Sequence, residues 1–193
     1  MNDEDLLKQL RSGNNESYRY LIDTHRNLVW NISLRMTGSK SVSEDLFQEV
    51  FFRVYKDIGK FRGESKLSTW IGSISFNVCS DYLRRKNRQR IFEDVDIANL
   101  EQISPWDKNP GAELYSLEIN EIVAGIIDNL KTSYKVLINL YHIEEFSYKE
   151  IAEITKMPVG TIKSYLNRAR AIIKDEILKN VPDFKEIHYE SFV

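Results

Sequence analysis

The sequence predicts an all-α protein made of two small helical domains. Apolar residues recur at steps of three and four along most of the 193 residues, and few stretches alternate with a period of two. Serine–glutamate pairs spaced by three and glycines just beyond apolar runs mark where helices begin and end. Hydrophobic residues make up 42% of the chain, which is enough for packed cores.

The first predicted domain covers residues 1–92 and begins with two helices. A short one is expected over residues 3–11, and a long one runs from about residue 15 to Met36, with Gly38 just past its end. His25 falls within the apolar stripe of the long helix, so we interpret it as a packed histidine rather than a metal ligand.

Two further helices complete this domain. Ser41 and Glu44 have the spacing of a capping box and predict the start of the third helix, which runs to about residue 58. Ser68 or Thr69 is expected to cap the fourth helix, which begins at Trp70 and ends in the basic run LRRKNRQR.

The third helix carries an unusual second face opposite its apolar one. This face is formed by Asp45, Gln48, Glu49, Phe52 and Lys56. Phe52 is the single aromatic residue among these polar ones, and periodicity favours a residue at the rim of the core over an anchor for a partner.

Basic residues gather at the end of the fourth helix, where Arg84, Arg85 and Lys86 lead into Arg88 and Arg90. Such a run is usually a solvated helix end. A basic cluster beside aromatic residues is also typical of proteins that hold a nucleic-acid backbone next to stacked bases.

The remaining chain divides into three predicted segments. Residues 93–112 form an acidic linker, interrupted by the Asn-Pro-Gly breaker that ends at Gly111. Residues 113–180 form the second domain, whose helices are expected to start near residue 112, to cover about 133–143 and to end in a helix-turn-helix. Residues 181–193 form a short tail.

The helix-turn-helix is the segment SYKEIAEITKMPVGTIKSYLNRAR. Ser147 and Glu150 form a capping box, and Pro158 separates the two helices. The second helix places apolar residues on one side and small or hydrogen-bonding ones on the other, with no acidic residue between 161 and 174. A solvated face usually mixes charges of both signs, so this pattern favours a helix that enters the major groove of DNA.

Composition excludes several other classes. One cysteine, Cys79, permits no internal disulfide, and three histidines far apart in sequence offer no metal-binding spacing, so we expect no cofactor. No residues are spaced for acid–base or metal catalysis, and we expect no enzyme. With no secretion signal or membrane-spanning run, the chain is expected to be cytoplasmic. A net charge of -2 favours a conditional DNA binder that works with a partner.

The motifs DLFQEVFFRVYK, FRGESKLSTWIGSISFNVCSDYLRRK and SYKEIAEITKMPVGTIKSYLNRAR, in this order, resemble the extracytoplasmic-function (ECF) sigma factors of bacterial RNA polymerase. The resemblance implies a non-catalytic subunit that binds core polymerase, reads the −10 and −35 promoter elements and helps to melt the −10 region. It also implies partners: the beta-prime clamp helices, the beta flap and, in many members, an anti-sigma factor.

The resemblance also implies roles for individual residues. The residues that resemble the clamp-binding surface are Asp45, Gln48, Glu49 and Phe52. Those that resemble the −10 contacts are Phe61, Lys66, Trp70, Asn77, Arg84, Arg85 and Lys86. Those that resemble the −35 contacts are Gly160, Thr161, Lys163, Ser164, Asn167 and Arg168. The acidic linker resembles the segment that enters the RNA path of the polymerase.

Three departures from the family pattern stand out. Tyr165 replaces a frequent arginine, Lys156 replaces a frequent turn glycine, and Lys131 replaces a frequent proline. Tyr165 puts the preference of this helix for particular bases in question.

Two other functional classes stay open on the residues alone. One is a stand-alone helix-turn-helix regulator with a helical sensor domain, which would bind a palindrome as a dimer. The other, much less favoured, is an enzyme that acts on nucleic acid.

Overall fold

The structure is a computed structural model that describes residues 3–86 and 116–180, and within these ranges it contains helices and short connections but no strand. This confirms the all-α prediction. The elements in order are α1 (Asp3–Arg11), α2 (Asn15–Thr37), α3 (Lys40–Asp57), the 3-10 helix η1 (Ile58–Lys60), α4 (Leu67–Arg85), α5 (Ser116–Asn129), α6 (Thr132–Ile138), the π-helix η2 (Asn139–Ile143), α7 (Tyr148–Thr155) and α8 (Val159–Asn180). The predicted linker 93–112, the tail 181–193 and the start of the second domain lie outside the described residues.

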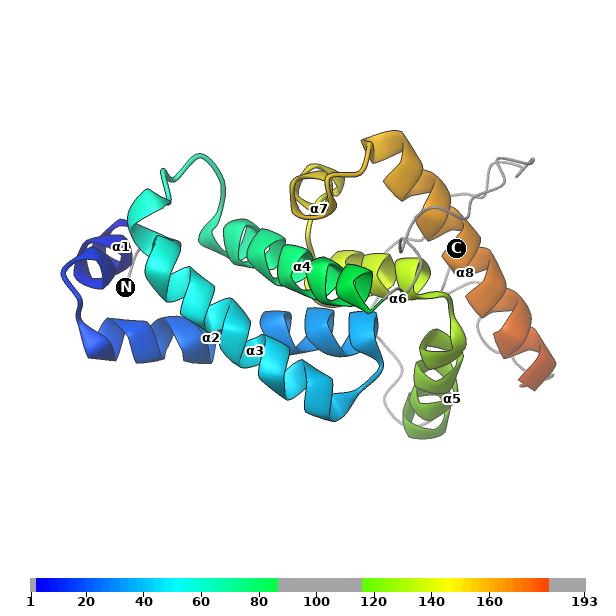
Figure 1. The fold of residues 1–193 in the computed structure, drawn as a ribbon. Helices are drawn as coiled ribbons and strands as arrows, with labels where there is room; N and C mark the ends of the chain where they lie inside the picture. Colours follow the sequence, from blue (N-terminus) through cyan, green and yellow to red (C-terminus); the bar gives the residue numbers. More distant parts are fainter. Residues whose placement is uncertain (1–2, 87–115, 181–193) are drawn as a thin grey trace.

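The N-terminal unit is a bundle in which α2, α3 and α4 pack against one another, with α1 at one end (Figure 1). Its fully buried side chains include Leu21, Val29, Val50, Val54 and Ile71. Each belongs to an apolar stripe that the three-and-four periodicity predicted.

The first two helices have the predicted ends. Asn14 caps α2, because its side chain accepts hydrogen bonds from the backbone of Glu16 and Ser17. At the other end Gly38 adopts a φ of 65°, a left-handed conformation that suits glycine, and its N–H donates to Leu34. His25 is half-buried in α2, as expected of a packed histidine.

The starts of α3 and α4 differ from the predictions. Ser39, rather than Ser41, caps α3, because the left-handed Gly38 leaves Ser39 in the extended conformation that a cap requires. The predicted Ser41–Glu44 capping box is therefore wrong. Helix α4 begins at Leu67 instead of Trp70. Thr69 does not cap it, because its side chain is turned into the core, where it is 1% exposed.

The C-terminal unit contains α5, α6, η2, α7 and α8, with α8 packed against α5, α6 and α7. The helix expected over 133–143 is α-helical only to Ile138 and continues as the π-helix η2. The predicted capping box of Ser147 and Glu150 is present: the Ser147 N–H donates to the Glu150 carboxylate at 2.8 Å, and the Glu150 N–H donates to the Ser147 hydroxyl at 3.3 Å.

The turn between α7 and α8 shows why a glycine suits the position of Lys156. Lys156 adopts a φ of 61°, which is the left-handed conformation that glycine adopts most easily. The carbonyl of Pro158 accepts the first hydrogen bond of α8, from Ile162 at 3.1 Å.

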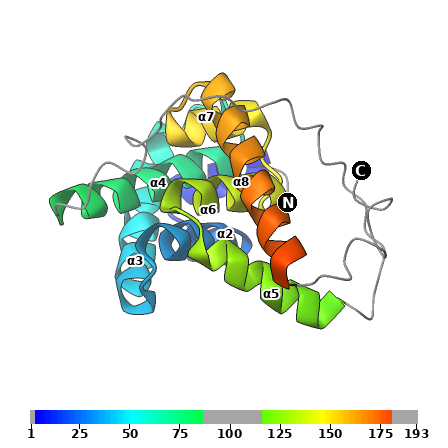
Figure 2. The same cartoon turned by 90° about the vertical axis from the view of Figure 1, so that its right-hand side faces the viewer.

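The two units lie directly against each other. Helix α4 contacts α7, and α2 contacts α6 (Figures 1 and 2). The fold therefore brings segments about 80 residues apart in sequence, such as Ser73 and Glu153, into hydrogen-bonding distance.

Candidate nucleic-acid and polymerase interfaces

The polar face of α3 is exposed along its whole length. Asp45, Gln48 and Glu49 are exposed, and the Phe52 side chain beside them is 63% exposed. This exposure excludes the interpretation of Phe52 as a rim residue of the core. The opposite side of α3 carries the buried Val50 and Val54, so the helix separates its two faces as its periodicity predicts.

Tyr55 extends this face, and the sequence interpretation missed it. Its side chain is 58% exposed, and its ring meets that of Tyr18 edge-on with the centroids 4.9 Å apart. The Tyr18 hydroxyl donates to the carbonyl of Phe51 at 2.5 Å, and burial raises the pKa of Tyr18 to about 12. The signal was present, because Tyr55 follows Phe52 by three residues and so lies on the same face.

Of the predicted −10 residues, the two aromatic ones in and after the loop between α3 and α4 are largely buried. Phe61 is only 5% exposed and packs against Trp70, with the ring centroids 5.2 Å apart. Its carbonyl accepts a hydrogen bond from Arg11 at 2.7 Å. In this conformation the Phe61 ring belongs to the core, and a base could stack on it only if the loop opened. Trp70 is half-buried by the same packing.

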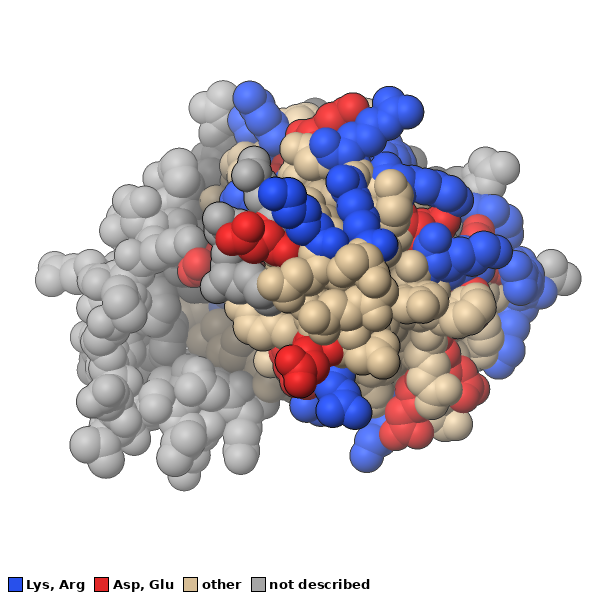
Figure 3. Space-filling model, turned by 90° about the vertical axis from the view of Figure 1, so that its left-hand side faces the viewer, with Lys and Arg blue, Asp and Glu red and all other residues tan. Residues whose placement is uncertain are grey.

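Basic residues gather on one part of the end formed by α1, η1 and the loop. Figure 3 views this end: lysines and arginines lie above and to the right of an uncharged central area, and acidic residues lie mainly below it. Lys60 pairs with Asp57 at 2.5 Å, whereas Arg62 lies 3.9 Å from Glu64 with both side chains mostly in solvent. Exposed pairs of this kind contribute little stability, so these cations remain available to phosphates.

The other predicted −10 residues are spread along α4 rather than gathered in one cluster. Lys66 stands at the start of the helix, Asn77 is exposed near its middle, and Arg84, Arg85 and Lys86 are exposed at its end. At 1.5 Å per residue this row is about 30 Å long. Its first member is engaged, because the Lys66 ammonium lies 2.9 Å from the Glu150 carboxylate of the C-terminal unit.

The predicted −35 residues lie near the start of α8, on the side away from its core. Gly160, Lys163 and Ser164 are exposed, and Thr161, Asn167 and Arg168 are half-buried. The core side of the same helix carries Ile162, Leu166 and Ala169, all 0% exposed. The Lys163 ammonium lies 5.4 Å from the centre of the Tyr148 ring, within the range of a cation–π contact.

Tyr165 and Arg170 lie elsewhere than the sequence suggested. Tyr165 is 3% exposed and meets Tyr134 edge-on with the ring centroids 5.5 Å apart, so its ring faces the core rather than the exposed side of α8. Arg170, whose charge the sequence places just after the predicted −35 residues, is not on the surface but 7% exposed. The spacing contained a signal for Tyr165, since positions 162, 165 and 169 recur at three and four on the apolar side.

Arg170 instead supports the helix-turn-helix from behind. Its guanidinium lies 5.2 Å from the centre of the Tyr141 ring and donates to His142 and to Asn167, both at 3.4 Å. The Tyr141 ring stacks on that of Tyr148 at 4.9 Å. A continuous series of rings and cations therefore connects η2, α7 and α8, and Lys163 and Asn167 both contact it.

A groove of about 580 Å³ lies between α5 and α8 on the C-terminal unit. Its apolar lining includes Ile122, Ile126, Leu130 and Ile172. Ile172 is 39% exposed, so part of this apolar lining is accessible from solvent.

The described residues offer no other kind of site. Within 3–86 and 116–180 no group of three or more histidine, cysteine, aspartate or glutamate residues is arranged to hold a metal ion. None of the described helices is long and apolar enough to cross a membrane.

Comparisons with known proteins agree with this arrangement. Residues 21–89 match the sigma-70 region 2 family, and residues 120–173 match the sigma-70 region 4 family. The chain is 31% identical over 182 residues to the ECF RNA polymerase sigma-E factor of Haemophilus influenzae, covering 92% of this chain and 96% of that protein. It is 29% identical over 177 residues to the ECF RNA polymerase sigma factor SigW of Bacillus subtilis, covering 89% and 94%.

Solved structures share the fold at lower sequence identity. CnrH in complex with the cytosolic domain of CnrY superposes with a TM-score of 0.62 at 20% identity, covering 93% of this chain and 98% of that one. RpoE of Bartonella quintana in complex with the anti-sigma factor NepR superposes with a TM-score of 0.61 at 20% identity, covering 84% and 97%.

Proposed function

Because this chain belongs to the ECF sigma factors of bacterial RNA polymerase, which direct that enzyme to promoters, we propose that its two helical units divide the work of promoter recognition between them. The N-terminal unit, with boundaries near 1–92, binds the polymerase and reads the −10 element. The C-terminal unit, near 113–180, reads the −35 element. Residues 93–112 connect the two.

The exposed face of α3 is the proposed docking surface for the clamp helices of the beta-prime subunit. It combines Asp45, Gln48 and Glu49 with the exposed ring of Phe52, and Tyr55 extends it. Aromatic anchors among polar residues are typical of the centre of protein–protein interfaces. Phe52 is the observation that carries the proposal, because its ring is 63% exposed among polar residues, as expected of an anchor for a protein partner.

The row along α4 is the proposed −10 surface. Lys66, Asn77, Arg84, Arg85 and Lys86 supply charges and an amide for single-stranded DNA, and Trp70 supplies an aromatic ring on which a base could stack. In this proposal Phe61 does not touch DNA; it packs against Trp70 and supports that ring.

The exposed side of α8 is the proposed −35 surface. Lys163 and Arg168 provide charge for phosphates or guanines, and Asn167 and Ser164 provide hydrogen-bonding groups for base edges. The groove between α5 and α8 has an apolar lining bordered by Asn129, Glu176 and Asn180, and we expect it to receive the flap of the beta subunit.

Family membership also leads us to expect a regulatory partner and a cellular compartment for this chain. We expect an anti-sigma factor as a further partner, since RpoE of Bartonella quintana is found with the anti-sigma factor NepR. The chain carries out no chemistry of its own in this proposal, and it acts in the cytoplasm, where the polymerase is.

The test is binding to core RNA polymerase followed by run-off transcription. Purified chain should bind core enzyme and direct it to discrete start sites on genomic DNA. Phe52→Ala should weaken core binding by at least tenfold, because aromatic anchors commonly contribute about 2 kcal/mol. Tyr20→Ala, which removes another exposed aromatic side chain (46% exposed) from α2, is the matched control and should bind normally.

Two results would contradict the proposal. One is a chain that binds no core enzyme but protects a palindrome as a dimer, which is the behaviour of a stand-alone regulator. The other is an equal loss of core binding in both variants, which would indicate a general effect of removing surface aromatics.

A further inference from the structure

Helix α1 is held by two neighbours. It contacts both α2 and η1, and it buries Leu6 and Leu10, which are 4% and 6% exposed. Its end is tied to the start of α2, because the Asn14 N–H donates to the carbonyl of Gln9 at 3.0 Å and the Ser17 hydroxyl donates to the Gln9 side chain at 2.5 Å. Helix α1 therefore has a fixed place beside η1, where the loop to α4 begins (Figure 1).

Arg11 extends from the last turn of α1 to the start of this loop. Its guanidinium donates to the carbonyl of Phe61 at 2.7 Å, across 50 positions of sequence. The Phe61 N–H donates to the carbonyl of Ile58 at 3.2 Å. Both backbone polar groups of Phe61 therefore have partners, and the bond from Arg11 is charge-assisted, which makes it stronger than a bond between neutral groups.

The Phe61 side chain carries this restraint to α4. Its ring is 5% exposed, and the ring centroid lies 5.2 Å from that of Trp70, which is half-buried. Aromatic rings at this separation favour particular relative orientations. A series of contacts thus runs from Arg11 through Phe61 to Trp70, the ring on which we expect a −10 base to stack.

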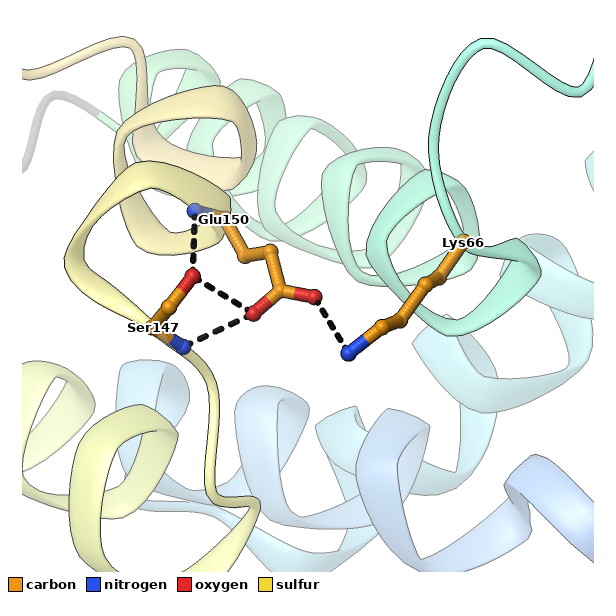
Figure 4. Close-up of polar contacts among 3 residues, drawn as sticks. All are labelled: Lys66, Ser147 and Glu150. Atoms are coloured by element: carbon orange, nitrogen blue, oxygen red, sulfur yellow. Dashed lines mark hydrogen bonds and ion pairs between the residues drawn. The ribbon is translucent and has the colours of Figure 1, made fainter.

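The far end of the loop is held separately. Figure 4 shows Lys66, the residue just before α4, with its ammonium 2.9 Å from one oxygen of the Glu150 carboxylate, whose other oxygen accepts the Ser147 N–H and hydroxyl. The partner of Lys66 thus comes from the C-terminal unit, whereas the contact between Arg11 and Phe61 lies within the N-terminal unit. The restraint from Arg11 therefore belongs to the unit that carries the proposed −10 surface.

We propose that Arg11 is a positioning residue of the −10 surface: by holding the Phe61 carbonyl, it keeps the Phe61 ring against Trp70 and thereby sets where the Trp70 ring meets an unstacked base. A binding surface is selective when its side chains are held in place by the residues behind them. The match to sigma-70 region 2 begins at residue 21, so α1 and Arg11 lie outside it. This inference rests on the proposed function, because it concerns the same −10 surface.

Quenching of Trp70 fluorescence tests the positioning without DNA. In a chain with Trp30→Phe and Trp106→Phe, Trp70 is the one remaining tryptophan, and quenching by acrylamide measures how accessible its ring is. Arg11→Gln should raise the quenching constant of Trp70 at least about 1.5-fold, because the loop loses the hydrogen bond that holds Phe61 against this ring.

Lys8→Gln is the matched control. It removes one positive charge from the same turn of α1, and Lys8 is exposed. Its quenching constant should equal that of the parent chain. If Arg11→Gln also keeps the parent value, Arg11 does not position Trp70 and the proposal is wrong.

A second measurement tests whether the position of Trp70 matters for reading bases. The probes are fluorescein-labelled single strands of about 12 nucleotides, made only of deoxyadenosine, deoxycytidine or thymidine, and they are titrated with the complex of the chain and core polymerase over a range of salt. Arg11→Gln should reduce the ratio of the tightest to the weakest affinity at least about twofold and leave the salt dependence unchanged, because stacking changes but no phosphate contact is lost. Lys8→Gln should keep the parent ratio.

Two results would overturn the positioning role. One is a more accessible Trp70 with an unchanged affinity ratio. The other is an equal loss of affinity for all three strands with a shallower salt dependence, which would make Arg11 a phosphate contact. Failure of the proposed function would be distinguishable, because the parent chain would then not bind core polymerase, whereas the quenching of Trp70 is measured on the chain alone.

Discussion

The two proposed DNA surfaces of this chain differ in how ready they are to bind. On α8 the exposed Gly160, Lys163 and Ser164 stand on a helix whose other side is packed, and Arg170 braces it from behind. On the N-terminal unit Phe61 is buried, Trp70 is half-buried and Lys66 is already paired with Glu150. The difference teaches that the proposed duplex surface is preformed, whereas the Phe61, Trp70 and Lys66 part of the proposed surface for melted DNA is covered or paired in this conformation.

The largest expected effect concerns the role of Phe61. If its ring belongs to the core, Phe61→Ala should lower the free energy of unfolding by about 3–5 kcal/mol, because it removes a buried aromatic side chain. Phe52→Ala should change it by less than about 0.5 kcal/mol, since that ring is 63% exposed. Urea unfolding followed by tryptophan fluorescence reports this, because Trp30 and Trp70 both belong to the N-terminal unit. If Phe61→Ala leaves the free energy of unfolding unchanged but weakens the binding of single-stranded DNA, Phe61 contacts DNA instead of stabilising the core.

A smaller effect is expected on α8. Lys163→Ala should reduce affinity for a −35 duplex and transcription that depends on it by about tenfold, the loss of one contact worth about 1–3 kcal/mol. Binding to core polymerase should not change. Lys179→Ala is the control, because Lys179 stands four turns further along the same helix and pairs with Glu176 at 2.7 Å. Loss of core binding in Lys163→Ala would mean that its role has been misplaced.

The smallest expected effect is on helix stability at the two predicted capping boxes, one in each unit. Ser147→Ala should cost about 1 kcal/mol, because it leaves the Glu150 N–H without its cap. Ser41→Ala should cost almost nothing, since Ser39 caps α3. Amide hydrogen exchange of α3 and α7 measures both. Equal losses at the two sites would show that Ser41 supports α3 in a way the structure does not reveal.

The helix-turn-helix was the part most readily predicted from sequence, because its signals are local. The Ser147–Glu150 pair, the Pro158 break and the three-and-four spacing of the buried residues of α8 all act within one or two turns. Tyr165 was placed by comparison with a family pattern, although its spacing from Ile162 already indicated the core side.

The predictions that failed depended on contacts that sequence does not display. Ser39 rather than Ser41 caps α3 because Gly38 turns the chain one residue earlier. Thr69 does not cap α4 because the core of the bundle takes its side chain. The burial of Phe61 also depended on tertiary contacts, because the sequence does not show whether an aromatic residue in a polar loop packs into the core or faces solvent.

By itself, the sequence determined that the protein is all-α, that it contains a helix-turn-helix and that a polar face with Phe52 runs along α3, because helix periodicity and capping are properties of neighbouring residues. Only the tertiary structure decided which of the predicted DNA residues are accessible. Lys66 and Glu150 are separated by 84 positions, and Gly72 and Ile154 by 82, so no local pattern links them. Their contact arises because two helices of separate units pack together, and such packing depends on the shape and charge of whole surfaces.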